Sequence, residues 1–131
     1  MLLDHIGLAV SDFTPAAAIL KTLGLQPRPP EEIPEQKVKT WSFRAGDAEI
    51  ELLLPTSDDS PITKFLQKKG SGIHHLAFRV ENVAAEIERL QALGIRMIDT
   101  KPRRGAGGKL IAFIHPQATG GILIELTQLG H

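Results

Sequence analysis

An internal repeat constrains the fold of this chain more than any other feature. The segment Asp4–Phe13 (DHIGLAVSDF) aligns without gaps on His74–Val83 (HHLAFRVENV), and in the same register LKTLGLQ in the first copy falls on LQALGIR in the second. Near the end of each copy, Ile50–Leu52 and Ile124–Leu126 both read IEL. Such self-similarity indicates two copies of one structural unit. Neither copy alone has enough apolar surface for a stable core, so we expect them to pack together.

Each copy contains the same order of predicted elements. A short apolar run, HIGLAV or HLAFRV, predicts a strand, and the polar pairs Ser11–Asp12 and Glu81–Asn82 then offer oxygens for a helix N-cap. Helices of about ten residues follow, and Gly24 and Gly94 stand where a left-handed C-terminal cap is expected. Three more strands are predicted in each copy: near Leu25, over 39–44 and over 48–54, and then over 96–99, 110–114 and 122–127.

The pattern is βαβββ twice, which predicts an α+β fold of two paired modules. Module one covers about residues 1–55 and module two about residues 73–131. The connector, residues 56–72, contains a predicted short helix over 61–68. A chain of 131 residues is long enough for one core and too short to need two, so we expect a single domain.

Composition excludes several classes of function. Fifteen basic residues balance fifteen acidic ones, so no overall field attracts the chain to nucleic acid or to an anionic membrane. Cysteine is absent, which rules out a disulfide framework, a thiolate metal site and a catalytic thiol. The N-terminal MLLDHIGLAV lacks the features of a signal peptide, and no apolar run approaches the roughly 20 residues that span a bilayer. We therefore expect a cytoplasmic protein.

The repeat duplicates two kinds of side chain that can bind a metal. His5 and His75 occupy equivalent positions on the first strand of each copy, and Glu51 and Glu125 occupy equivalent positions on the last. Each glutamate interrupts an apolar run, where an ionised carboxylate is costly unless it is paired or bound to a metal. A single histidine or glutamate in such a place is more often structural or solvated, but here both types recur in both copies. Because imidazole and carboxylate together suit a divalent cation, we predict a metal site at these four residues.

The other three histidines do not fit this site. His74 precedes His75 on a predicted strand and therefore points to the opposite face, so we interpret it as structural. His115 precedes Pro116 in an expected hairpin loop, and we interpret it as a loop residue, with a substrate contact as the alternative. His131 is the last residue, and we expect it to be disordered.

Several motifs together resemble the methylmalonyl-CoA epimerases, a family of the vicinal oxygen chelate superfamily, which also includes glyoxalase I. The motifs are DHIGLAV, EIELLLP followed by DSPI, GIHHLAFRV, FIHPQATGG and GILIELTQ. DHIG and GIHH alone indicate only the superfamily, whereas DSPI and the C-terminal HP..TGG.LIELTQ pattern narrow it to the epimerases. The resemblance extends from Asp4 to Gln128.

This resemblance implies a fold, a ligand set and a reaction. The implied fold is a cupped mixed sheet built from two βαβββ modules around one divalent metal ion: Co²⁺, Mn²⁺, Ni²⁺, Zn²⁺ or Mg²⁺. The family's ligands fall on His5, Glu51, His75 and Glu125. The implied reaction interconverts (2R)- and (2S)-methylmalonyl-CoA by α-proton abstraction through a metal-stabilised enolate. The protein is then expected to be a homodimer that acts on a small acyl-CoA.

Inversion at carbon requires proton exchange on both faces, and Glu51 and Glu125 are the expected acid/base pair. The chain also departs from the family pattern. Some members have Gln where Glu51 stands, and some carry an additional glutamate where Thr40 stands. A lysine that is common after the HP pair is replaced by Gln117, which removes one expected substrate contact.

The phosphates of CoA require a local basic cluster, because the chain has no net charge. One candidate cluster surrounds the glycine-rich GAGG segment, where backbone amides can also approach an anion. Its members are Lys101, Arg103, Arg104 and Lys109, and a competing patch contains Arg28, Lys37 and Lys39. A solvated loop explains the first cluster equally well.

Three alternatives come from the same superfamily. Glyoxalase I uses similar ligands and the same proton chemistry, and composition does not separate it from an epimerase. A metal-free antibiotic-binding protein of the same fold leaves Glu51 and Glu125 unexplained. An extradiol dioxygenase needs iron with open coordination, so a fourth protein ligand argues against it.

Overall fold

The computed structural model describes residues 1–128. Residues 129–131, and with them the expectation for His131, lie outside the described part. The chain divides into two compact units. The N-terminal unit is His5–His74, and the C-terminal unit begins at His75 and also includes Met1–Asp4.

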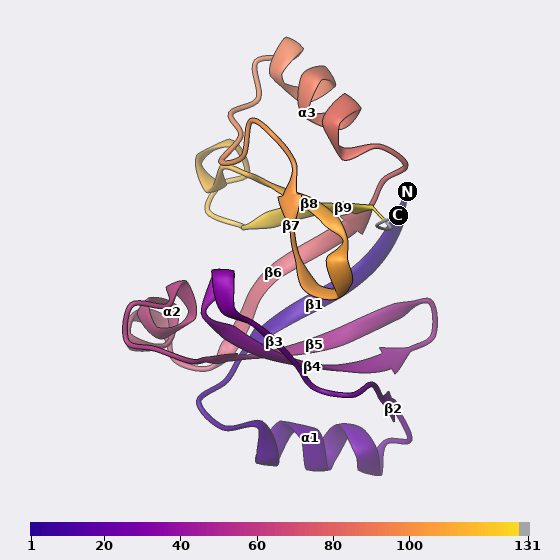
Figure 1. Ribbon diagram of the computed structural model, residues 1–131, viewed down its shortest axis with the longest axis vertical. Coiled ribbons are helices and arrows are strands. Elements are labelled where there is room, and N and C mark those ends of the chain that lie inside the picture. The colour runs from indigo at the N-terminus through magenta and orange to yellow at the C-terminus, as the bar shows by residue number, and fades with distance from the viewer. Residues whose placement is uncertain (129–131) are drawn as a thin grey trace. The chain divides into compact units, whose positions relative to one another are not determined.

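Figure 1 labels the helices and strands along the chain. The elements up to the connector helix are β1 (Leu2–Ala9), α1 (Phe13–Thr22), β2 (Gln26–Pro27), β3 (Glu31–Ile33), η1 (Pro34–Gln36), β4 (Val38–Ala45), β5 (Ala48–Pro55) and α2 (Pro61–Lys69). They are followed by β6 (Gly72–Arg79), α3 (Val83–Ala92), β7 (Arg103–Arg104), η2 (Ala106–Gly108), β8 (Leu110–Ile114), η3 (Pro116–Ala118) and β9 (Ile124–Gln128).

Both units contain the same strand arrangement. In the N-terminal unit β1 runs parallel to β5, and β4 pairs antiparallel with β5. In the C-terminal unit β6 runs parallel to β9, and β8 pairs antiparallel with β9. A helix follows the first strand in each case, α1 after β1 and α3 after β6. The predicted α+β class, with two βαβββ modules and a mixed sheet, is confirmed.

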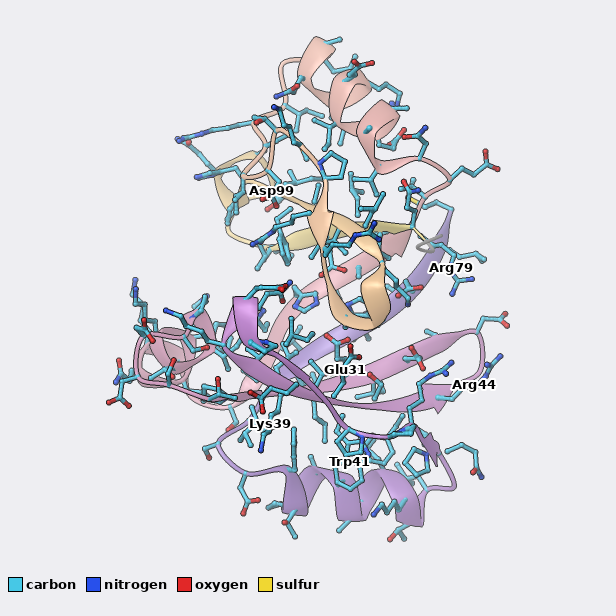
Figure 2. All side chains as sticks on the ribbon, viewed as in Figure 1. Glu31, Lys39, Trp41, Arg44, Arg79 and Asp99 are labelled. Atoms are coloured by element: carbon cyan, nitrogen blue, oxygen red, sulfur yellow. The ribbon has the colours of Figure 1, made fainter. Side chains whose placement is uncertain are left out.

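Helix α1 covers one face of the N-terminal strands (Figure 1). Ala17 of α1 packs with Phe43 of β4 and Leu52 of β5, and all three are almost inaccessible to solvent. Trp41 of β4 points toward α1 (Figure 2), and its ring meets Phe13 edge-on with 5.8 Å between the ring centroids. This apolar core occupies one face of the sheet, so the opposite face of β5 remains for other side chains.

Helix α3 covers one face of the C-terminal strands in the same way. Val83, Ile87 and Leu90 are buried and lie at helical spacing, as the sequence predicts. They pack against Ala112 of β8 and Leu126 of β9. The second core is therefore built on the same plan as the first.

The predicted caps define the ends of both helices. The side chains of Asp12 and Asn82 each accept a hydrogen bond from a backbone amide of the first turn, at 3.0 Å in both cases. Gly24 and Gly94 follow the C-terminal ends with φ of 92° and 81°, a region that a residue with a Cβ rarely adopts. The connector helix α2 agrees with its prediction to within one residue.

One predicted strand is wrong, and two short strands were missed. Residues 96–99 make only an isolated bridge, from Met97 to Ile114, because the carboxylate of Asp99 accepts the hydrogen bond of the Phe113 amide at 2.8 Å in place of a backbone carbonyl. The missed strands, β3 and β7, add to β4 and β8 as short outer strands. Their sequences, EEI and RR, are mostly exposed and charged and carry no strand pattern. Within residues 1–128, no helix is long and apolar enough to cross a membrane.

Candidate metal and acid/base site

Glu51 and Glu125 lie on the strand faces opposite those that pack against α1 and α3. The next residue in each strand, Leu52 or Leu126, belongs to the core under α1 or α3. Because neighbouring side chains in a strand point to opposite faces, each glutamate points away from its helix. Both are nevertheless buried, which is the environment in which a carboxylate requires a compensating partner.

A small residue lies beside each glutamate on the adjacent parallel strand. Gly7 of β1 is in register with Glu51, and Ala77 of β6 is in register with Glu125. Neither neighbour extends a long side chain over the carboxylate. The histidine of each module lies two residues before this small residue and therefore shares its face of the strand.

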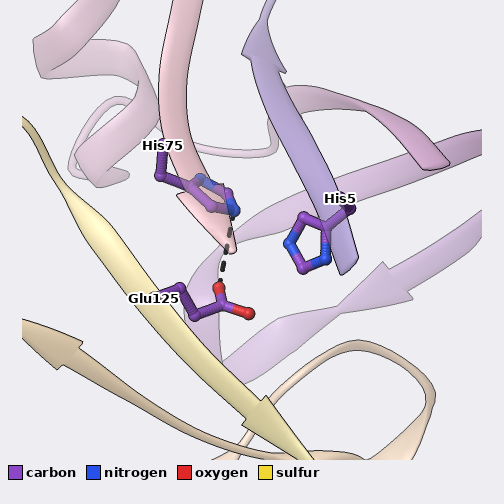
Figure 3. A group of neighbouring side chains, drawn as sticks. All are labelled: His5, His75 and Glu125. Carbon is purple, nitrogen blue, oxygen red and sulfur yellow. Dashed lines mark ion pairs between the residues drawn. The ribbon is translucent and has the colours of Figure 1, made fainter. Parts of the chain in front are cut away.

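The structure brings a histidine and a glutamate together in each unit. In the N-terminal unit His5 Nε2 lies 3.8 Å from Glu51 Oε1, and the two side chains are 8% and 11% exposed. In the C-terminal unit His75 Nε2 lies 3.4 Å from Glu125 Oε1, the pair joined by the dashed line in Figure 3, with side chains 5% and 6% exposed. The repeat seen in the sequence is therefore a repeat of buried imidazole–carboxylate pairs.

These separations fit two ligands of one cation. They exceed the roughly 2.7–3.2 Å of a strong N–H···O hydrogen bond. Two atoms that each lie about 2.1 Å from a divalent cation are separated by roughly 3.0–3.4 Å in octahedral or tetrahedral coordination. The His75–Glu125 pair lies at this value and the His5–Glu51 pair slightly beyond it. Imidazole and carboxylate donors are compatible with several divalent metals and do not select one.

His74 has a different environment from His75. Its ring meets Phe65 of α2 edge-on, with 5.1 Å between centroids. Burial, helped by the positive charge of Lys69, lowers the pKa of His74 to about 4. The imidazole is therefore neutral near pH 7, which agrees with a structural role.

His115 and Gln117 support the loop between β8 and β9. His115 Nδ1 accepts a hydrogen bond from the Gln117 amide at 3.0 Å, so it caps the turn that begins at Pro116. The side chain of Gln117 accepts a hydrogen bond from Arg96 at 2.7 Å. Gln117, which replaces the family's lysine, therefore makes its side-chain hydrogen bond within the C-terminal unit.

Several basic residues considered for CoA binding lie beside carboxylates. Arg103 and Lys109 of the GAGG cluster pair with Asp99 and Asp4, and Arg28 and Lys37 of the competing patch pair with Glu49 and Asp59. Arg104 donates to the carbonyl of Gly108 within the glycine-rich turn. Both clusters are therefore partly neutralised, and a CoA phosphate contact at either stays a prediction.

The structure adds two carboxylates to which no role was assigned from the sequence. Asp4, only 3% exposed, accepts from Arg79 Nε at 3.1 Å and from Lys109 Nζ at 3.4 Å. Glu31 of β3 lies opposite Thr40 in the strand register, and Figure 2 labels it. The DHIG motif already contains Asp4 and could have drawn attention to it. The position of Glu31 beside Thr40 follows only from the pairing of β3 with β4.

Comparisons with known proteins agree with the resemblance seen in the motifs. Residues 4–113 match the family model of the Glyoxalase/Bleomycin resistance protein/Dioxygenase superfamily. The human mitochondrial methylmalonyl-CoA epimerase is 40% identical over 96% of this chain and 73% of its own length. An ethylmalonyl-CoA/methylmalonyl-CoA epimerase of Cereibacter sphaeroides is 38% identical over 97% of both chains.

A solved structure is similar over almost the whole chain. It is a variant of Streptomyces coelicolor methylmalonyl-CoA epimerase in complex with 2-nitronate-propionyl-CoA. The TM-score is 0.90 at 33% identity, covering 98% of this chain and 94% of that one. The predicted resemblance is confirmed, and so is the expectation of an enzyme, because the named relatives are epimerases.

Proposed function

Because the chain belongs to the Glyoxalase/Bleomycin resistance protein/Dioxygenase superfamily, we propose that it is a metal-dependent epimerase that interconverts (2R)- and (2S)-methylmalonyl-CoA. The observation that carries the proposal is the buried histidine–glutamate pair that recurs at equivalent positions of the two modules. The named relatives, which are epimerases of methylmalonyl-CoA, support the substrate class. One of them is named for ethylmalonyl-CoA as well, so a small difference in acyl chain is compatible with this site.

The proposed ligand set is His5, Glu51, His75 and Glu125. Three of its members are drawn in Figure 3, and each offers an imidazole nitrogen or a carboxylate oxygen from a buried side chain. We propose that the two pairs hold one divalent cation and that the whole chain folds as one domain. The repeat supports this arrangement, because two equivalent pairs supply a four-ligand set.

The reacting hydrogen of methylmalonyl-CoA lies between a thioester and a carboxylate. Its removal places negative charge on the thioester oxygen, and a bound divalent cation would supply the positive charge that stabilises it. The neutral imidazoles of His5 and His75 would orient that cation without adding charge. Burial of all four side chains excludes bulk water, which strengthens electrostatic interactions at the reacting atoms.

We propose that Glu51 and Glu125 transfer the proton on opposite faces of the carbon. One carboxylate accepts the proton and the other, in its protonated form, returns a proton to the opposite face, and the roles exchange with the direction of reaction. Where a glutamate also holds the cation, its partial displacement or a bound water would carry the transfer. Some members of the family carry an additional glutamate at the position of Thr40. Thr40 lies on β4, two residues before Ser42, which is in register with Glu51. A threonine hydroxyl, however, is a poor acid or base near neutral pH. In module one the transfer is therefore assigned to Glu51.

The test is deuterium incorporation from solvent. Metal-free protein is reloaded with Co²⁺ and incubated with (2R)-methylmalonyl-CoA in D₂O, and the substrate is analysed by mass spectrometry beside a sample without enzyme. We expect deuterium at the α-carbon and loss of this exchange after chelation. An absence of enzyme-dependent exchange with metal bound would contradict the proposal. Lactoylglutathione formation, measured with the same preparation, distinguishes glyoxalase I, and a protein that binds no metal would favour the antibiotic-binding alternative.

A homodimer and a cytoplasmic location, both expected from the sequence, stay predictions.

A further inference from the structure

Phe113 lies between the buried His75 and the surface of the C-terminal unit. Its ring meets the His75 imidazole edge-on, with centroids 5.8 Å apart and an interplanar angle of 88°. On β8, Phe113 is directly in register with Glu125. The phenyl ring therefore contacts one member of the His75–Glu125 pair and lies opposite the other.

Two charged residues fix Phe113 from the outer side. Its backbone amide donates a 2.8 Å hydrogen bond to Asp99 Oδ2. The guanidinium of Arg103 lies over the phenyl ring, 5.2 Å from its centroid, and Arg103 Nε is 3.2 Å from Asp99 Oδ1. Asp99, labelled in Figure 2, thus holds both the main chain of Phe113 and the cation above its ring.

The N-terminal unit has a different residue at the equivalent place. Ser42 of β4 is in register with Glu51, as Phe113 is with Glu125. A serine offers no aromatic edge to a neighbouring imidazole. The two histidine–glutamate pairs are equivalent in sequence but differ in the side chain beside them. The distance from imidazole Nε2 to carboxylate Oε1 is also shorter in the pair beside Phe113, at 3.4 Å against 3.8 Å.

We propose that Phe113, fixed by Asp99 and Arg103, is a positioning residue that holds the His75 imidazole with Nε2 toward Glu125. The inference rests on the metal site in the proposed function and deepens it, because it makes the module-two pair the pre-organised half of that site. Because ring pairs prefer an edge-to-face arrangement, the contact with Phe113 favours one orientation of the His75 imidazole. Outer partners that hydrogen-bond to a ligand histidine change metal affinity by about 10–100-fold when they are removed, and an aromatic contact is expected at the lower end of that range.

The experiment compares Phe113→Leu with Phe65→Leu in the full chain. Phe113→Leu keeps an apolar side chain but removes the aromatic edge from His75, and we expect Co²⁺ binding to weaken by about 10-fold. Phe65→Leu removes a similar edge contact from His74, which is not a proposed ligand, and should leave Co²⁺ affinity unchanged. Phe113→Tyr retains the aromatic edge and should restore most of the affinity. Circular dichroism checks that each variant is folded.

A second measurement does not need the metal. In metal-free protein, ¹H–¹⁵N spectra of the histidine rings should show altered His75 signals in Phe113→Leu and altered His74 signals in Phe65→Leu. Asp99→Asn keeps an acceptor for the Phe113 amide but removes the negative charge beside Arg103, so a smaller change at His75 is expected. It also serves as the test if Phe113→Leu does not fold.

The outcomes separate this inference from the proposed function. Unchanged Co²⁺ affinity and unchanged His75 signals in folded Phe113→Leu would overturn the positioning role even if the wild type is an active epimerase. Weaker Co²⁺ binding in Phe113→Leu, with wild-type protein that shows no deuterium exchange, would support the positioning role and contradict the epimerase. If the wild type binds no Co²⁺, the proposed metal site is wrong, and the metal-free spectra alone decide whether Phe113 orients His75.

Discussion

Glu51 and Glu125 are single charged residues within apolar strand sequences. Each is a buried carboxylate in a strand whose neighbouring residues form apolar core. Such a group costs stability unless the folded protein compensates it, so its presence points to chemistry and not to packing. In both units the equivalent histidine lies beside the carboxylate, at 3.8 Å from Glu51 and 3.4 Å from Glu125.

Substitution of either glutamate should separate activity from folding. We expect Glu51→Gln and Glu125→Gln each to lower kcat/KM for methylmalonyl-CoA by about 100-fold or more, the usual scale of a lost acid/base group. Their denaturation midpoints without metal should stay close to that of the wild type. Glu49→Gln is the matched control, because Glu49 lies on the same strand and pairs with Arg28. Normal turnover in both site variants would contradict the acid/base assignment.

His74 predicts a pH dependence of stability. Its pKa is lowered from 6.5 to about 4, chiefly by burial, so the unfolded chain binds a proton more readily than the folded one. The stability contributed by neutral His74 is therefore fully present above pH 6.5 and is lost as the pH falls from 6.5 toward 4. In protein freed of metal with a chelator, the free energy of unfolding should fall less between pH 7 and pH 5 in His74→Phe than in the wild type. Equal falls would contradict the prediction.

At the scale of elements, each helix depends on a cap that the repeat duplicates. Asp12 accepts a hydrogen bond from the Thr14 amide in α1, and Asn82 accepts one from the Ala85 amide in α3. The helices then present Ala17 in one unit and Val83, Ile87 and Leu90 in the other to the strands below. The cap thus sets where the apolar face of each helix begins.

Removal of either cap should cost similar stability. Asp12→Ala and Asn82→Ala should each lower the free energy of unfolding by about 1 kcal/mol, because one backbone amide loses its acceptor. Serine at either position should restore most of the loss, since it is also a good cap. Urea denaturation of metal-free protein measures both effects. If the alanine variants lost no more stability than the serine variants, the cap would not be the source of the stability.

At the scale of the whole molecule, the number of metal sites depends on whether the two modules share one cation. The His5–Glu51 and His75–Glu125 pairs belong to different units. If each pair bound its own ion, the repeat would give two independent weak sites. One shared ion would instead join the modules and stabilise the folded chain by mass action.

Metal titration distinguishes these cases. We expect one Co²⁺ per chain and a higher unfolding temperature when it is bound. His5→Ala and His75→Ala should each weaken binding by more than about 100-fold, since losing a ligand costs more than losing an outer partner, and should abolish the thermal shift. His115→Ala is the control, because His115 caps the η3 turn. Two ions in the wild type, with one retained in each single variant, would contradict a shared site.

The sequence alone determined the modular plan and the candidate ligands. Strand and helix identity, the caps at Asp12 and Asn82, and the equivalence of the histidines and glutamates all depend on local periodicity or on the repeat. These signals lie within short segments, where side-chain alternation and capping chemistry act directly. These features could therefore be predicted without knowing which distant residues are in contact.

Only the tertiary structure decided the surroundings of those ligands. Phe113 contacts His75, and Asp99 holds Phe113 where a strand was expected, because strand register and loop path bring these separate segments together. Likewise, Glu31 stands beside Thr40 only through the pairing of β3 with β4. Contacts between segments far apart in the chain are set by the packing of the whole fold, and no local pattern encodes them.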